Sequence, residues 1–148
     1  MNQITVITAA YNAGKFIAQT IDSVINQALR PYQHIIIDDC STDNTLEIIR
    51  DYEKRYKHIK VVNNSENLGF PGSLNVGIKS TESEFIAILD ADDIAYEDWL
   101  EQLLPVIESD EEISTVGGGC MIMTEHCIKT NNSKFTSTQG AGDVPILV

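Results

Sequence analysis

Three carboxylates fall within four positions in the stretch FIAILDADDIAYEDW, residues 85–99. Asp90, Asp92 and Asp93 directly follow the apolar run Phe85–Leu89, which we interpret as a buried strand. Like charges this close repel one another, and partial desolvation adds to the cost. Oxygen ligands without a nearby His or Cys suit a hard cation such as Mn²⁺ or Mg²⁺, which offsets that repulsion. The D-x-D pattern therefore predicts a divalent metal site on Asp90 and Asp92.

An isolated D-x-D pattern is weak evidence, because aspartates also form turns and cap helices. Residues two apart on extended backbone point the same way, roughly 6.5–7 Å apart. We therefore expect Asp90 and Asp92 to face one site, with Ala91 turned away or its backbone against a ligand. A second acidic pair, Asp38–Asp39, also ends an apolar run, and this favours a site over a simple turn.

Short apolar runs rich in Ile and Val alternate with segments of helical period, which predicts a βαβαβαβαβ order and an open, mostly parallel sheet. The expected strands are Ile4–Thr8, His34–Ile37, Ile59–Val62, Phe85–Leu89 and Ile113–Val116. The first expected helix carries an apolar stripe at Phe16, Ile17, Ile21, Val24, Ile25 and Leu29. The second follows STDN, the third covers about Pro71–Lys79, and the fourth begins near Glu97, with Pro105 expected to kink or shorten it.

Ligands of such sheets bind beyond the carboxyl ends of the strands. Polar residues follow the first strand there, and Tyr11 among them could stack on an aromatic ring. Asp39 could accept a hydrogen bond from a nucleobase, although a turn aspartate and a half-buried tyrosine remain alternatives. The segment NNSENLGFPGSLNVGI, residues 63–78, is a glycine-containing loop and short helix that could approach a ligand. It matches neither the dinucleotide nor the P-loop fingerprint.

The 148 residues are most simply one domain, and the net charge of −12 argues against nucleic-acid binding. Neither a signal peptide nor an apolar run of membrane-spanning length is visible, so we expect a cytoplasmic protein. Cys40, Cys120 and Cys127 are odd in number and lack CxxC spacing. We expect the last two to be structural thiols rather than metal ligands with His126.

Four blocks together resemble the GT-A glycosyltransferases of family two: ITVITAAYNAGKFIAQTIDSVINQ, IIIDDCSTDNT, NSENLGFPGSLNVGI and FIAILDADD. Their order and spacing match over about residues 3–105. The resemblance implies a Rossmann-like nucleotide-diphospho-sugar transferase fold, with a mostly parallel central sheet flanked by helices. By this resemblance, the nucleotide pocket would be lined by Thr8, Ala9 and Tyr11, and the base would be contacted by Asp39. The ribose and diphosphate would lie against Asp90 and Ala91, and the metal would be bound by Asp92. The loop that closes over the donor would include Asn67, Gly72 and Asn75.

This chain departs from the family pattern in three places. Family members commonly have Pro where this chain has Thr8-Ala9, and Gly where it has Cys40. They also continue well past this length and carry an acceptor-side Asp or Glu as general base. Asp143, in a Gly-rich stretch, is a poor candidate for that base. We therefore expect one donor-binding domain over residues 1–148, truncated before the acceptor-binding portion, with the catalytic residue unknown.

The expected function is inverting, metal-dependent transfer of a sugar, in most family members from a UDP-sugar, to an acceptor hydroxyl. The resemblance implies a saccharide or lipid-linked acceptor, polysaccharide biosynthesis, and peripheral contact of a full-length protein with the inner membrane face. A non-catalytic nucleotide-sugar-binding module is the alternative, because the base is missing. A phosphoacceptor receiver domain would need an aspartate after the third strand, where Val62, Asn63 and Asn64 stand. A glycoside hydrolase would need carboxylates on opposite sides of the scissile bond.

Overall fold

The structure is a computed structural model that describes residues 4–110, 112–118 and 146–147. All five predicted strands and all four predicted helices are present in that part of the chain, and one further strand, β6, was not predicted. The elements in chain order are β1 (Ile4–Ala10), α1 (Ile17–Ile25), β2 (Gln33–Asp38), α2 (Thr45–Arg55), β3 (Ile59–Asn63), α3 (Gly69–Lys79), β4 (Phe85–Ile88), α4 (Trp99–Glu108), β5 (Thr115–Val116) and β6 (Ile146–Leu147).

The sheet has the strand order β3-β2-β1-β4-β6-β5, and every pairing between these strands is parallel. The predicted α/β fold with a parallel central sheet is thus confirmed. Strands β2 and β3 extend the sheet on one side of β1, whereas β4 pairs with its other side. The order reverses between β1 and β4, so the carboxyl ends of these two strands flank the position where open α/β sheets bind ligands.

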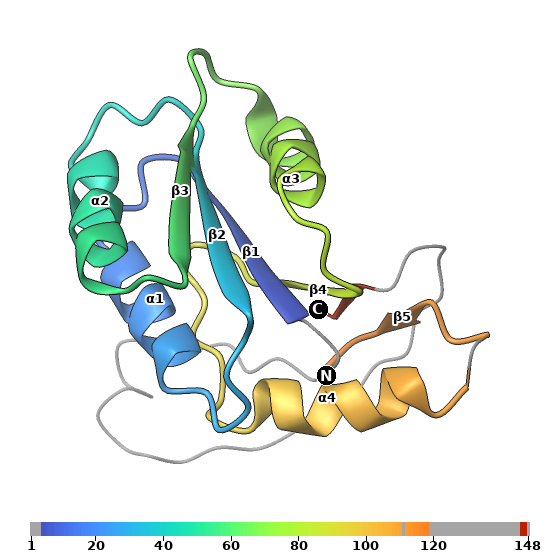
Figure 1. The fold of residues 1–148 in the computed structure, drawn as a ribbon. Coiled ribbons are helices and arrows are strands. Elements are labelled where there is room, and N and C mark those ends of the chain that lie inside the picture. Colours follow the sequence, from blue (N-terminus) through green and yellow to red (C-terminus); the bar gives the residue numbers. More distant parts are fainter. Residues whose placement is uncertain (1–3, 111, 119–145, 148) are drawn as a thin grey trace.

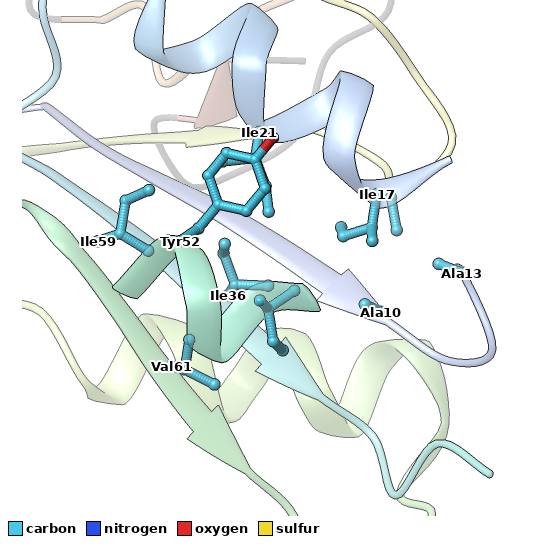
Figure 2. Packing of buried hydrophobic residues seen from close by; sticks show 10 residues of the cluster. Ala10, Ala13, Ile17, Ile21, Ile36, Tyr52, Ile59 and Val61 are labelled. Atoms are coloured by element: carbon cyan, nitrogen blue, oxygen red, sulfur yellow. The ribbon is translucent and has the colours of Figure 1, made fainter. Parts of the chain in front are cut away.

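Helices cover both faces of the sheet. Figure 1 shows α1 and α2 on one face and α3 on the other. Ile36 packs with residues of α1 and α2, among them Ile17, Ile21 and Tyr52, as Figure 2 shows. Its neighbours Ile35 and Ile37 belong to the cluster under α3. Because β2 is buried on both faces, its sequence is an unbroken apolar run rather than an alternating one.

Helix α3 lies very close to the sheet, and Gly77 allows this approach. A Cβ atom at Gly77 would lie 2.6 Å from Ile7 Cγ2 and 2.8 Å from Ile37 Cδ1. Any larger side chain would therefore push the helix away from β1 and β2 and open the packing of that face.

Several predicted boundaries differ from the structure by one or two residues, and the more informative differences occur at α1, α4 and β5. Helix α1 ends at Ile25 and does not reach Leu29. Helix α4 continues through Pro105 to Glu108, so the proline does not end it. Leu103 and Ile107, on either side of Pro105, pack in one core cluster and hold the helix together there. Strand β5 begins only at Thr115, because the Ile113 N–H donates to the Asp110 carbonyl in a turn.

The predictions made for Cys120, His126, Cys127 and Asp143 lie outside the described residues.

Candidate functional site

A pocket of about 350 Å³ opens where β1 and β4 end, at the reversal of strand order. The residues that line it come from the end of β1 and the loop after it, the start of α3 and the turn after β4: Ala9, Tyr11, Asn12, Ala13, Phe16, Phe70, Asp90, Ala91 and Asp92. Five of the ten predicted donor-binding residues are therefore brought together in one cavity: Ala9, Tyr11, Asp90, Ala91 and Asp92. Three of the lining residues are aromatic, Tyr11, Phe16 and Phe70, and two are carboxylates, Asp90 and Asp92.

Asp90 and Asp92 share the pocket for a different reason from the one predicted. Strand β4 ends at Ile88, and the Asp93 N–H donates to the Asp90 carbonyl at 3.1 Å. This hydrogen bond closes a turn over residues 90–93, so the backbone is not extended there. We call these four residues the acidic turn. Ala91, at 8% exposed, packs into the core cluster of α1 and α2.

Two carboxylates of the acidic turn, Asp90 and Asp93, have a raised pKa. Partial desolvation and the neighbouring Asp92 charge raise the pKa of Asp90 above its ordinary value. Partial desolvation also raises the pKa of Asp93, with the charges of Asp90 and Asp92 adding to the effect. Among the described residues, neither the Asp90 nor the Asp92 side chain accepts a hydrogen bond from the protein. A cation bound to these carboxylates would relieve their repulsion.

The donor set fits a hard cation that also binds a ligand. Within the described part of the chain, no group of three or more His, Cys, Asp or Glu residues is placed to hold a metal ion. If Asp90 and Asp92 held a cation, they would supply one or two carboxylate ligands, and the other positions would fall to substrate oxygens or water. Mg²⁺ is commonly bound in this way, by one or two carboxylates plus substrate phosphates.

Asp39 lies after β2 and is held quite differently. It is 3% exposed, and its Oδ1 accepts hydrogen bonds from the Leu68 N–H and Asn64 Nδ2, both at 2.8 Å. Burial would raise the pKa of Asp39, but hydrogen bonds from Leu68, Asn64, Ser73 and Gly69 outweigh it and lower the pKa. Asp39 does not line the pocket. It ties the loop before α3 to the end of β2, and its contact with a nucleobase stays a prediction.

Thr8 also lies beneath the pocket rather than in its lining. Its side chain is fully buried, and Oγ1 lies 3.0 Å from His34 Nε2 on β2. Burial, with a smaller contribution from the His58 charge, lowers the pKa of His34 to about 3. The imidazole is therefore neutral at physiological pH. His34 Nδ1 has no hydrogen-bond partner among the described residues.

Side-chain hydrogen bonds join the loops that follow β1 and β2. Asn12 Oδ1 accepts from the Thr42 N–H at 2.8 Å, and the Asn12 N–H donates to Ser41 Oγ at 3.0 Å. The Gly14 N–H donates to Asp43 Oδ2 at 3.0 Å. Asn12 adopts a φ of 51°, which Asn tolerates better than most residues. These bonds fix the loop that carries Tyr11 at the mouth of the pocket.

The segment before and within α3 reaches the pocket through a residue that was not predicted. Asn67 Oδ1 accepts from the Gly69 N–H at 3.1 Å, and neither Asn67, Gly72 nor Asn75 lines the pocket. Phe70 does, with its side chain 50% exposed. The predicted role of this loop in closing over the donor is untested, and Phe70 is its contribution to the cavity.

Sequence reasoning missed four lining residues: Asn12, Ala13, Phe16 and Phe70. Phe16 was assigned to the apolar stripe of α1, but it precedes the helix and is 42% exposed. The Lys15 ammonium lies 5.1 Å from the centre of its ring. The signal that could have identified Phe16 is its position in the loop after β1, at the edge of the sheet where ligands bind.

Comparison with known proteins now adds to this geometry. The sequence profile of the family described as "Glycosyl transferase family 2" matches residues 5–132, which is most of the chain. This chain belongs to glycosyl transferase family 2. Its parallel sheet, with the acidic turn at the switch point, is accordingly the GT-A fold, and the predicted family is confirmed.

Two bacterial relatives illustrate the sequence similarity to this family 2 chain. An uncharacterized glycosyltransferase of Haemophilus influenzae is 38% identical over 122 residues, which cover 82% of this chain and 38% of the relative. The poly(ribitol-phosphate) beta-N-acetylglucosaminyltransferase TarP of Staphylococcus aureus is 37% identical over 107 residues, covering 70% of this chain and 32% of TarP. The chain thus spans well under half the length of these relatives.

Solved structures agree with the family 2 assignment. The crystal structure of S. aureus TarS 1–349 has a TM-score of 0.69 at 30% identity, over 78% of this chain and 35% of TarS. TarS has also been solved in complex with UDP and with UDP-GlcNAc. The mannosyltransferase PcManGT of Pyrobaculum calidifontis, in complex with GDP-Man and Mn²⁺, has the same TM-score at 24% identity, which shows the shared fold.

In the described part of this family 2 chain, no helix combines the length and apolar character needed to cross a membrane.

Proposed function

We propose that this chain binds a nucleoside-diphosphate sugar, with UDP as the nucleotide, and that a divalent cation, Mn²⁺ or Mg²⁺, joins the diphosphate to Asp90 and Asp92. The observation that carries the proposal is the pair of carboxylates, Asp90 and Asp92, in the pocket at the strand-order reversal. Their charges repel one another, and their side chains accept no hydrogen bond from the described residues. A cation and an anionic diphosphate together satisfy such a site. The TarS complexes with UDP and UDP-GlcNAc favour uracil as the base.

The aromatic residues of the pocket would bind the parts of the donor that carry no charge. The exposed ring of Tyr11 would stack on the base, while Phe16 and Phe70 would exclude water around the sugar. Thr8, predicted for the nucleotide pocket, is buried beside Ala9 on β1 and bonds His34. Asn67, Gly72 and Asn75 belong to the segment that carries Phe70, and we propose that this segment closes over the bound donor.

The proposed reaction is transfer of the sugar with inversion. The acceptor oxygen forms a bond to the anomeric carbon as the bond from that carbon to the diphosphate oxygen breaks. The acceptor proton passes to a base, and the nucleoside diphosphate leaves with the electron pair. Asp90 and Asp92 would hold the divalent cation, which neutralises charge on that leaving group.

Donor binding without transfer is the second candidate, and one observation favours it for this chain. The carboxylates that line the pocket in the described residues are Asp90 and Asp92, and both are assigned to the cation. No carboxylate of the described pocket is left to act as base. We therefore expect this 148-residue chain to bind the donor and to transfer sugar weakly or not at all, and we place the base in the acceptor-binding portion of a longer protein. Robust transfer to a sugar acceptor by this chain would contradict that expectation.

Calorimetric titration of UDP into the chain tests the donor site. We expect heat of binding with Mn²⁺ present and none with EDTA. Asp92→Asn should abolish the metal-dependent binding. Asp51→Asn is the matched control, because Asp51 is an exposed carboxylate on α2 that pairs with Arg55, away from the pocket.

The nucleotide is tested separately from the cation site. If UDP gives no heat but GDP does, the cation site stands and the choice of uracil is wrong. If the folded chain binds neither nucleotide with Mn²⁺, the proposed donor site is wrong for this chain.

A further inference from the structure

The segment between β4 and α4, residues 89–98, carries the acidic turn and has no helix or strand of its own. Helix α1 and the loop after it supply several of its hydrogen bonds. Thr20 Oγ1 donates to the Ala91 carbonyl at 2.9 Å, and the Ala95 N–H donates to Ser23 Oγ at 3.1 Å. Gln27 Nε2 donates to the Tyr96 carbonyl at 2.5 Å. The acidic turn is therefore held by another part of the chain.

Thr20 and Ser23, spaced i and i+3, lie on one face of α1, and Gln27 follows in the loop after the helix ends at Ile25. We call these three residues the polar stripe. Thr20 and Gln27 are 1% and 3% exposed, so their polar atoms would be costly without partners. The Gln27 Oε1 also accepts the Leu100 N–H at 3.1 Å, in the first turn of α4, where helical N–H groups lack intrahelical partners. The stripe thus binds the segment from its acidic turn to the following helix.

Thr20 holds the part of this segment that carries the two pocket carboxylates. Its partner, the carbonyl of Ala91, stands between the two carboxylates that line the pocket. The hydrogen bond is buried, so water cannot readily replace the Thr20 hydroxyl. Without that hydroxyl the Ala91 carbonyl would be buried without this donor, and the peptide units on either side would be free to rotate toward another one.

We propose that Thr20 is a positioning residue of the donor site, which orients Asp90 and Asp92 through the Ala91 carbonyl, and that Ser23 and Gln27 hold the rest of the segment. This inference rests on the proposed function for the role of the two carboxylates. The hydrogen bond from Thr20 to the acidic turn does not depend on any ligand.

Three variants separate positioning from general stability. Thr20→Val keeps the shape of the side chain and removes the hydroxyl, whereas Thr20→Ser keeps the hydroxyl and removes the methyl group. Thr5→Val is the matched control, because Thr5 is equally buried and bonds Thr81 and Ser83 at the opposite end of β1. All three are compared with the unaltered chain by hydrogen exchange and by UDP titration.

Amide hydrogen exchange of the ligand-free chain measures directly how firmly the acidic turn and the residues after it are held. In Thr20→Val we expect exchange in residues 90–98 to be about tenfold faster, the change that corresponds to one net hydrogen bond. Thr20→Ser and Thr5→Val should leave this segment unchanged. Equal exchange of the segment in Thr20→Val and the unaltered chain would overturn the proposal.

UDP titration with Mn²⁺ measures the effect of each variant on the affinity of the donor site. We expect Thr20→Val to weaken binding about tenfold, and Thr20→Ser to restore it. Faster exchange with undiminished affinity would overturn the positioning role. If Thr20→Val does not fold, Thr20→Ala replaces it in both measurements, since it also removes the hydroxyl that bonds the Ala91 carbonyl. An unaltered chain that binds neither UDP nor GDP contradicts the proposed function, while exchange still decides whether Thr20 holds the turn.

Discussion

Asp39 and Asp90 both follow buried parallel strands, yet the protein surrounds the two carboxylates in opposite ways. Asp39 is buried and accepts hydrogen bonds from Leu68 and Asn64, which help to lower its pKa. Asp90 faces the pocket beside other carboxylates, and desolvation and the Asp92 charge raise its pKa. The first carboxylate is stabilised by the fold itself. The second lies in a cluster that a bound cation would stabilise.

The difference separates two roles that look alike in sequence. An acidic residue at a strand end can order a loop by accepting N–H groups, or it can bind a ligand that brings positive charge. Removing a carboxylate of the first kind should lower stability, whereas removing one of the second kind should lower affinity. Each of the following changes tests whether the two sites divide in this way.

The largest effect on stability is expected for Asp39→Ala. This change leaves the Leu68 N–H without its acceptor and removes one of the two acceptors of Asn64 Nδ2, which keeps Ser73, so we expect the free energy of unfolding to fall by about 3 kcal/mol. Urea denaturation measures it. Asp90→Ala is the matched change in the acidic turn and should alter stability by no more than about 0.5 kcal/mol, or raise it, because a repelling charge is lost. Equal losses of stability in Asp39→Ala and Asp90→Ala would show that the two carboxylates do not differ in role.

The buried base His34 differs from the buried acid Asp39, because the fold favours the neutral form of the imidazole. Burial holds the pKa of His34 at about 3, against 6.5 for the exposed side chain. The unfolded chain therefore binds a proton that the folded chain does not as pH falls below 6.5. Stability should fall by about 2 kcal/mol between pH 7 and pH 5 from this group, and this loss continues until the pH passes the folded pKa.

Urea denaturation of the chain and of His34→Gln at both pH values measures this contribution. The variant should lose most of the pH dependence, whereas His58→Gln should retain most of it. An unchanged pH dependence in His34→Gln would show that the imidazole is not held neutral in the fold.

A smaller effect is expected at Cys40, the residue after Asp39. Cys40 has a φ of 62°, a left-handed conformation that favours Gly. Cys40→Gly should therefore raise the free energy of unfolding by about 1 kcal/mol, after the greater chain entropy of Gly is counted. Asn12 has a φ of 51°, but Asn12→Gly should destabilise the chain because its side chain bonds Thr42 and Asp43. Urea denaturation of both variants should give opposite signs, and a gain in both would contradict the role given to Asn12.

The fold was largely predictable because the apolar runs and helical periods carry most of its information. The run at Ile35–Ile37 indicated a strand buried on both faces, and the structure places it so. Strand β6 was missed because its two residues pair in the sheet only through contacts far along the chain. Helix α4 passed Pro105 because tertiary packing on both sides of the proline outweighs its local effect.

The site was predictable where it depends on strand ends and less so where it depends on contacts between distant segments. Asp90 and Asp92 were identified from their place after β4. Phe70 and Phe16 were missed because nothing local shows that their loops turn toward the same cavity. The hydrogen bond from Thr20 to Ala91 joins residues 71 positions apart, and no spacing rule on one helix reveals it.

The most direct test of the central claim locates the cation. Mn²⁺ is added in small amounts with UDP to the ¹⁵N-labelled chain, and the loss of each amide signal is followed, because paramagnetic broadening falls steeply with distance from the ion. The account predicts that the signals of Ala91, Asp92 and Asp93 vanish first, and that Asp92→Asn prevents this while Asp51→Asn does not. Broadening that begins instead at the acidic residues of α4, or that is the same in Asp92→Asn, would contradict it.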